Sequence, residues 1–118
     1  MKRLVQALFA AAALIFAAPA ALAHVELVSS SPAANATVAA PGQITLRFSD
    51  TFVPAFSSFE IVNASGAAVE VRSSAREDRK SLVGIPARPL AAGRYTLNWR
   101  IASGDGHRMT GSFAFTVR

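Results

Sequence analysis

The sequence predicts an all-β sandwich or barrel for most of the chain, and three observations support this prediction. Several windows alternate apolar and polar residues with a period of two, which is typical of strands with one buried face. Turn-forming runs rich in Gly, Pro, Asn and Ser separate these windows at intervals of about 8–12 residues. No segment after residue 23 has the long 3.6-residue period of an amphipathic helix.

The chain begins with a segment that has the pattern of a secretory signal peptide. Lys2 and Arg3 precede a long apolar run, Pro19 interrupts this run, and residues 21–23 (Ala-Leu-Ala) match an A-x-A cleavage site. The run is nearly long enough for a transmembrane anchor, but the proline and the small residues favour cleavage. We therefore expect residues 1–23 to be removed after Ala23, and residues 24–118 to form one exported domain.

The composition of the mature domain excludes several classes of function. Ten basic and seven acidic residues remain after cleavage, so the net charge is +3 rather than the +5 of the whole chain. The arginines are dispersed, and we expect no nucleic-acid partner. The absence of cysteine excludes disulfides, thiolate metal sites and a cysteine nucleophile.

Three windows give the clearest strand patterns. Residues 43–48 have apolar side chains at the even positions, and residues 113–117 have Phe113, Phe115 and Val117 on one side. Residues 94–101 form an apolar face of Tyr95, Leu97, Trp99 and Ile101. These faces are expected to pack in the core. Weaker strand patterns occupy residues 25–28, 59–62, 67–71 and 80–85.

The two histidines of the chain are the candidates for metal chemistry. After cleavage His24 becomes the N-terminal residue, and its α-amine and imidazole Nδ1 can chelate one ion. Asp105 and His107 are two positions apart, and in an extended segment they point to the same side. The plain alternatives are a solvated N-terminus and a turn capped by Asp105. The spacing alone does not show whether His24 meets the other two residues.

These residues would supply two imidazoles, one amine and one carboxylate. Such nitrogen and oxygen donors in a tetragonal arrangement suit Cu(II), and zinc would accept them in a tetrahedral one. Cu(I) prefers sulfur, and the mature domain has only Met109. We predict Cu(II), with binding weakened below about pH 6 by protonation of the nitrogen donors.

The mature sequence also resembles a known family along most of its length. The resemblance rests on residues 24–36 (HVELVSSSPAANA), 44–50 (ITLRFSD), 90–107 (LAAGRYTLNWRIASGDGH) and 110–117 (TGSFAFTV). These segments are similar to the CopC family of periplasmic copper resistance proteins.

The resemblance implies a Greek-key β-sandwich of cupredoxin-like or immunoglobulin-like type that binds one Cu(II) per chain in the periplasm. His24, Asp105 and His107 match the copper ligands of the family. Asp50 matches a further family carboxylate but is one methylene shorter, so an outer-shell role is expected. The implied partner is a CopD-type inner-membrane protein, and we expect a monomer.

One departure from the family pattern concerns Cu(I). Some relatives carry a Met-rich loop with a histidine, whereas residues 62–72 here contain neither Met nor His. We therefore predict no second, Cu(I) site, and we expect Met109 to serve packing.

The predicted function is a copper carrier or buffer rather than an enzyme. One alternative is a copper oxidase, because an N-terminal histidine on a β-sandwich also resembles lytic polysaccharide monooxygenases. Copper-dependent oxygen consumption that cleaves a polysaccharide would identify it. The other alternative is a structural sandwich with incidental histidines, whose thermal stability copper would not change.

Overall fold

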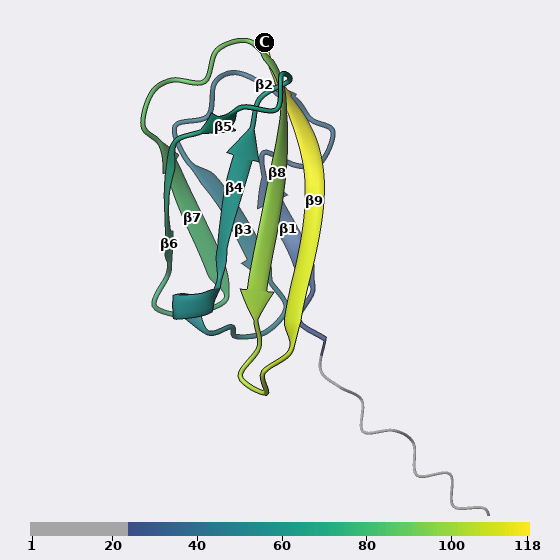
Figure 1. Ribbon diagram of the computed structural model, residues 1–118, viewed down its shortest axis with the longest axis vertical. Coiled ribbons are helices and arrows are strands. Elements are labelled where there is room, and N and C mark those ends of the chain that lie inside the picture. The colour runs from purple at the N-terminus through teal and green to yellow at the C-terminus, as the bar shows by residue number, and fades with distance from the viewer. Residues whose placement is uncertain (1–23) are drawn as a thin grey trace, which may run out of the picture.

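The computed structural model describes residues 24–118, and the expected signal peptide at residues 1–23 lies outside this range. The described chain forms two packed β-sheets (Figure 1). The four-stranded sheet contains, in spatial order, β1 (Leu27–Ser31), β3 (Ile44–Phe48), β7 (Ser81–Pro86) and β6 (Val71–Ala75). The five-stranded sheet contains β2 (Thr37–Val38), β9 (Arg108–Val117), β8 (Gly93–Ala102), β4 (Ser58–Val62) and β5 (Ala68–Val69).

The order of the strands is that of an immunoglobulin-like sandwich. The first, third, seventh and sixth strands share one sheet, and the ninth, eighth and fourth strands form the centre of the other. All pairs are antiparallel except β2 with β9, which is parallel. The all-β sandwich expected from the sequence is confirmed, and the strand order follows its immunoglobulin-like form.

The core lies between the sheets, where the predicted alternation places it. Even-numbered residues of β3 and odd-numbered residues of β8 and β9 point inward and make up about half of the buried apolar residues. Trp99 is half-buried, and its indole ring packs edge-on against Phe48 with ring centroids 5.2 Å apart. Full burial of one such large apolar side chain stabilises the fold by roughly 1.5–3 kcal/mol.

The strand prediction was wrong in part, and the first strand, expected at residues 25–28, is β1 at Leu27–Ser31. Residues 67–71, expected as one strand, are divided between β5 in one sheet and the start of β6 in the other. The whole of β6 has the sequence Val-Arg-Ser-Ser-Ala, and Ser73 interrupts its inward face between Val71 and Ala75. β6 forms because its backbone pairs with β7 along its whole length.

A tyrosine fixes the chain where it enters β8. The hydroxyl of Tyr95 donates a hydrogen bond to the carbonyl oxygen of Ala91 at 2.7 Å. Its ring stacks on Phe115 with centroids 5.6 Å apart. This arrangement is the tyrosine corner of immunoglobulin-like sandwiches, a role that the strand pattern alone did not reveal.

Several connections meet at one end of the sandwich, the lower end in Figure 1. The backbones of Glu26 and Ser49 are hydrogen-bonded there, with Ser49 N donating to Glu26 O at 2.8 Å. Val53 N donates to Ala102 O at 2.8 Å. The start of β1, the segment after β3, and the β8–β9 loop are therefore close together. Within residues 24–118, no helix is long and apolar enough to cross a membrane.

Candidate metal centre

The loop between β8 and β9, residues 103–107, is a tight turn closed by its own backbone. Ser103 N donates to His107 O at 2.8 Å, and Gly106 N donates to Ser103 O at 3.0 Å. Gly106 has φ +91°, in the region that favours glycine. The sequence argument assumed an extended segment here, and that assumption was wrong.

The turn nevertheless brings Asp105 and His107 together. Nδ1 of His107 lies 2.9 Å from Oδ2 of Asp105, and His107 N donates to Oδ1 at 3.2 Å. The hydroxyl of Ser103 also donates to Oδ1. Oδ1 is thus held by two donors of the turn, and Oδ2 faces the imidazole.

These contacts keep the carboxylate charged. The Ser103 hydrogen bond and, after it, those from His107 lower the pKa of Asp105 to about 2. Both side chains of the pair are about half exposed, so an ion can reach them from solvent. The sequence motif contained Ser103, but its role in fixing Asp105 was missed. A hydroxyl two positions before an Asp in a glycine-rich turn is the signal that could have identified it.

His24 lies at the same end of the sandwich but does not join this pair. His24 is exposed, whereas the next residue, Val25, is 4% exposed and belongs to the core. Glu26 is fixed to Ser49, since Glu26 N donates to Ser49 Oγ at 2.8 Å. Among residues 24–118, no group of three or more His, Cys, Asp or Glu side chains is close enough to hold a metal. In the uncut chain the backbone nitrogen of His24 is in the peptide bond to Ala23.

The remaining predicted residues lie apart from the pair. Oδ1 of Asp50 accepts a hydrogen bond from Thr51 N at 2.7 Å, and no hydrogen bond of the described chain joins it to the histidines or Asp105. Met109 is half-buried and packs against the core, in accordance with its predicted packing role.

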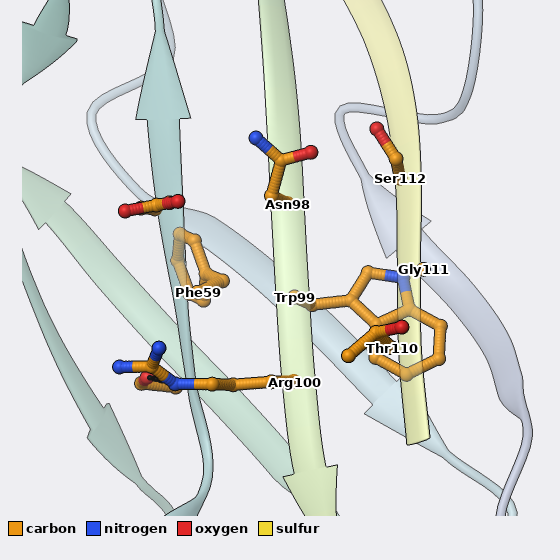
Figure 2. A pocket seen from close by; sticks show the side chains of 9 residues that line it. Phe59, Asn98, Trp99, Arg100, Thr110, Gly111 and Ser112 are labelled. Atoms are coloured by element: carbon orange, nitrogen blue, oxygen red, sulfur yellow. Dashed lines mark hydrogen bonds between the residues drawn. The ribbon is translucent and has the colours of Figure 1, made fainter.

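A shallow hollow of about 400 Å³ lies on the outer face of the five-stranded sheet (Figure 2). Figure 2 shows Asn98 and Arg100 on β8 beside Thr110 and Ser112 on β9. None of the predicted metal ligands lines this hollow.

The fold and the loop together define a small immunoglobulin-like sandwich with an Asp–His pair at one end. The family model of the CopC domain matches residues 27–118, and the chain belongs to this family. The family is one of binding proteins rather than enzymes, as expected from the sequence.

One curated relative is similar along nearly the whole chain. Copper resistance protein C of Pseudomonas syringae pv. tomato is 42% identical over 118 residues, which cover 94% of this chain and 92% of that protein.

Solved structures agree with this assignment. The crystal structure of PcoC, described as a methionine-rich copper resistance protein from Escherichia coli, aligns with a TM-score of 0.76 and 40% identity. The alignment covers 81% of this chain and 100% of PcoC. The Lin-41 filamin domain aligns with a TM-score of 0.55 and 19% identity over 80% of this chain and 91% of its own, which is a likeness of fold alone.

Proposed function

We propose that this protein is a periplasmic copper-binding protein that holds one Cu(II) and acts as a carrier or buffer in copper resistance. Membership of the CopC family and the copper resistance proteins among its relatives support this function. The observation that carries the proposal is the pair of donors formed by Asp105 and His107.

The geometry of the pair suits Cu(II). Two donors at right angles on one ion, each about 2.0 Å away, are about 2.8 Å apart, whereas tetrahedral donors are about 3.3 Å apart. The observed 2.9 Å between Nδ1 and Oδ2 is close to the first value. In the metal-free chain this distance is also within the range of a hydrogen bond, so a bound ion would replace the direct contact between the two side chains. Asp105 also offsets the charge of the ion.

His24 completes the proposed donor set after the signal peptide is removed. Its freed α-amine and its imidazole add two nitrogens to those of the loop. Because His24 stands apart from Asp105 and His107, we infer that the ion itself draws the N-terminus onto the loop. Asp50, at the same end, is proposed to act outside the ligand sphere.

The lack of available sulfur ligands disfavours Cu(I). The domain has no cysteine, and its single methionine, Met109, packs against the core. PcoC is described as methionine-rich, and this chain lacks that property. We therefore propose no second, Cu(I) site. The implied recipient is a CopD-type inner-membrane protein, which a monomeric carrier would meet at the membrane surface.

The proposed function is tested by Cu(II) titration of the mature protein that begins at His24, followed by electron paramagnetic resonance. An otherwise identical protein that retains Ala23 is the matched control, because the added residue blocks only the amine. One nitrogen-rich site is expected, with affinity at least about 100-fold lower in the control, since a chelating ligand is lost. Equal affinity in the two proteins would exclude the N-terminal site.

A further inference from the structure

An aromatic side chain is displayed to solvent at the end of the sandwich that carries the Asp–His pair. Phe56, in the 3-10 helix η1 (Pro54–Phe56), is 64% exposed. Of the three large apolar side chains that are exposed within residues 24–118, it is the aromatic one. The apolar surface of this ring is therefore available to a partner.

The segment that presents Phe56 is fixed rather than loose. Ser57 is nearly buried, and its hydroxyl donates to Val53 O at 2.7 Å while accepting from Ala102 N at 3.1 Å. Val53 N donates to Ala102 O at 2.8 Å. These bonds join η1 to the end of β8, so the ring is held in place before any partner arrives. Such preorganisation lowers the entropy cost of binding.

A hollow of about 400 Å³ lies beside the Phe56 ring and carries positive charge. Arg100 on β8 and Arg108 on β9 line it, together with residues of η1 and neighbouring hydroxyl groups, and its lining contains no carboxylate. Within residues 24–118, neither guanidinium takes part in an ion pair. Arg100 Nε donates to Ser58 Oγ at 3.1 Å, which orients its side chain.

This hollow continues into the one shown in Figure 2, because both are lined by Ser58, Arg100 and Thr110. The combined surface follows the outer face of β4, β8 and β9 toward the 103–107 loop. Glu60, in the part shown in Figure 2, is the single acidic side chain that lines it.

We propose that Phe56, Arg100 and Arg108 form a docking surface for an acidic segment of a partner protein that exchanges copper with this chain. Carboxylates of the segment pair with the two guanidiniums, and an apolar side chain packs on the Phe56 ring. A free anion would leave the ring uncovered, and so the chemistry of the surface specifies a peptide that is both acidic and apolar.

The position of the surface connects it with the metal loop. Ala102, which anchors η1, directly precedes Ser103, and Arg108 directly follows His107. A partner segment seated on the surface would therefore lie beside the donors of the ion. The exchange role rests on the proposed copper-binding function, whereas docking of the segment can be measured without copper.

The test uses a short synthetic peptide of alternating Asp and Leu, added to ¹⁵N-labelled mature protein with and without Cu(II). Amide shifts are expected to change at residues 55–58, 100 and 108–110, and added salt should weaken binding because the charges are exposed. The double variant Arg100→Gln/Arg108→Gln should bind the peptide at least about tenfold more weakly. Phe56→Ser should weaken binding by about three- to tenfold.

Matched controls use exposed residues elsewhere. Arg72→Gln/Arg94→Gln removes the same charge from other positions, and Ile85→Ser removes another exposed apolar side chain. Both should bind the peptide as the unaltered protein does. Equal binding by Arg100→Gln/Arg108→Gln, shifts confined to other residues, or equal binding of an alternating Lys and Leu peptide would overturn the docking surface.

Copper titration of the same variants separates the two proposals. Arg100→Gln/Arg108→Gln should keep its Cu(II) affinity within about threefold, because neither arginine is a ligand. If the unaltered protein binds the peptide here but binds no copper, the docking surface stands and the proposed function fails. If it binds copper but not the peptide, the docking surface fails and the proposed function stands.

Discussion

Two turns at opposite ends of the sandwich share one backbone design and differ in their side chains. In residues 63–67, Asn63 N donates to Ala67 O and Gly66 N donates to Asn63 O, each at 2.9 Å. Residues 103–107 repeat both bonds at the equivalent positions, and each turn has a glycine with positive φ at its fourth residue. Figure 1 places the first turn, after β4, at the end opposite the second.

The difference lies in how the side-chain acceptors are used. In the first turn Asn63 Oδ1 accepts hydrogen bonds from Ser65 N, Ser65 Oγ and Ala67 N, so all of its donors belong to the turn itself. In the second turn the acceptor is at the third residue, Asp105, which satisfies the turn with Oδ1 and leaves Oδ2 beside His107. The two turns share only the glycine at the fourth residue, and the candidate metal site depends on the third and fifth side chains of the second turn, Asp105 and His107.

The largest effect is expected when Asp105 and His107 are replaced by the side chains at the equivalent positions of the first turn. The double variant Asp105→Ser/His107→Ala gives residues 103–107 the third and fifth side chains of residues 63–67. Cu(II) affinity should fall at least about 100-fold, because two ligands are lost. The melting temperature should change by less than about 4 °C, since both side chains are half exposed.

The reciprocal variant Ser65→Asp/Ala67→His is the control for this prediction. It places an Asp–His pair at the opposite end, far from His24, and should add no second tight site. Retention of affinity by the first variant, or a second tight site in the reciprocal one, would show that the turn side chains do not define the site.

An intermediate effect is expected from the glycines that the turns share. Gly66 and Gly106 have φ +82° and +91°, and a Cβ at either would meet no atom within 4 Å, so only backbone strain opposes it. Each Gly→Ala change should lower the free energy of unfolding by about 1–2 kcal/mol in urea titration. Gly42→Ala, also in open space but without positive φ, should lower it by less than about 0.5 kcal/mol.

Cu(II) affinity should also distinguish the two glycine variants. Gly106→Ala should also weaken Cu(II) binding, because it disturbs the turn that aligns Asp105 with His107. Gly66→Ala should leave Cu(II) binding unchanged. Similar copper affinities for the two variants would mean that the turn geometry does not align the donors.

The smallest effect concerns the ionisation of Asp105. Because its pKa is lowered to about 2, its contribution to folding is fully present above its usual pKa of 3.8 and is lost as the pH falls through about 2. A ¹³C NMR titration of the metal-free protein should give a midpoint near 2. Ser103→Ala removes the largest cause and should raise that midpoint toward 3.8, whereas an unchanged midpoint would exclude the role of Ser103.

This ionisation also affects the pH dependence of copper binding. Asp105 remains a carboxylate through the range in which affinity should decline, below about pH 6, so the decline reports proton competition at the nitrogen donors. Affinity that is constant from neutral to mildly acidic pH would contradict the nitrogen ligands.

The fold was predictable where a strand has one apolar face. Alternation in β3, β8 and β9 identified both the strands and their inward sides, because these strands lie over the core. The polar strand β6 escaped prediction because it depends on pairing with β7. The sequence did not predict the exposed position of Phe56 for a related reason. The hydrogen bond from Ala102 to Ser57 that holds its segment joins residues far apart in the sequence.

The candidate site was predictable in part. Asp105 and His107 are neighbours in one loop, so local spacing was enough to pair them, although the turn was not foreseen. The position of His24 relative to this loop depends on the pairing of β1 with β3 and on the Val53–Ala102 contact. Those are tertiary contacts, which no local pattern encodes.

The burial of Val25 makes the N-terminus a very short tether. After the proposed cleavage, only one residue, His24, would precede the fixed pair Val25 and Glu26, and its Cα would stay about 3.8 Å from that of Val25. A tether of this length gives the donors a high effective concentration near the loop. The position of cleavage would therefore be critical. One extra residue would block the amine of His24, and one fewer would remove its imidazole. Only molecules whose signal peptide is cleaved directly before His24 would then bind the metal.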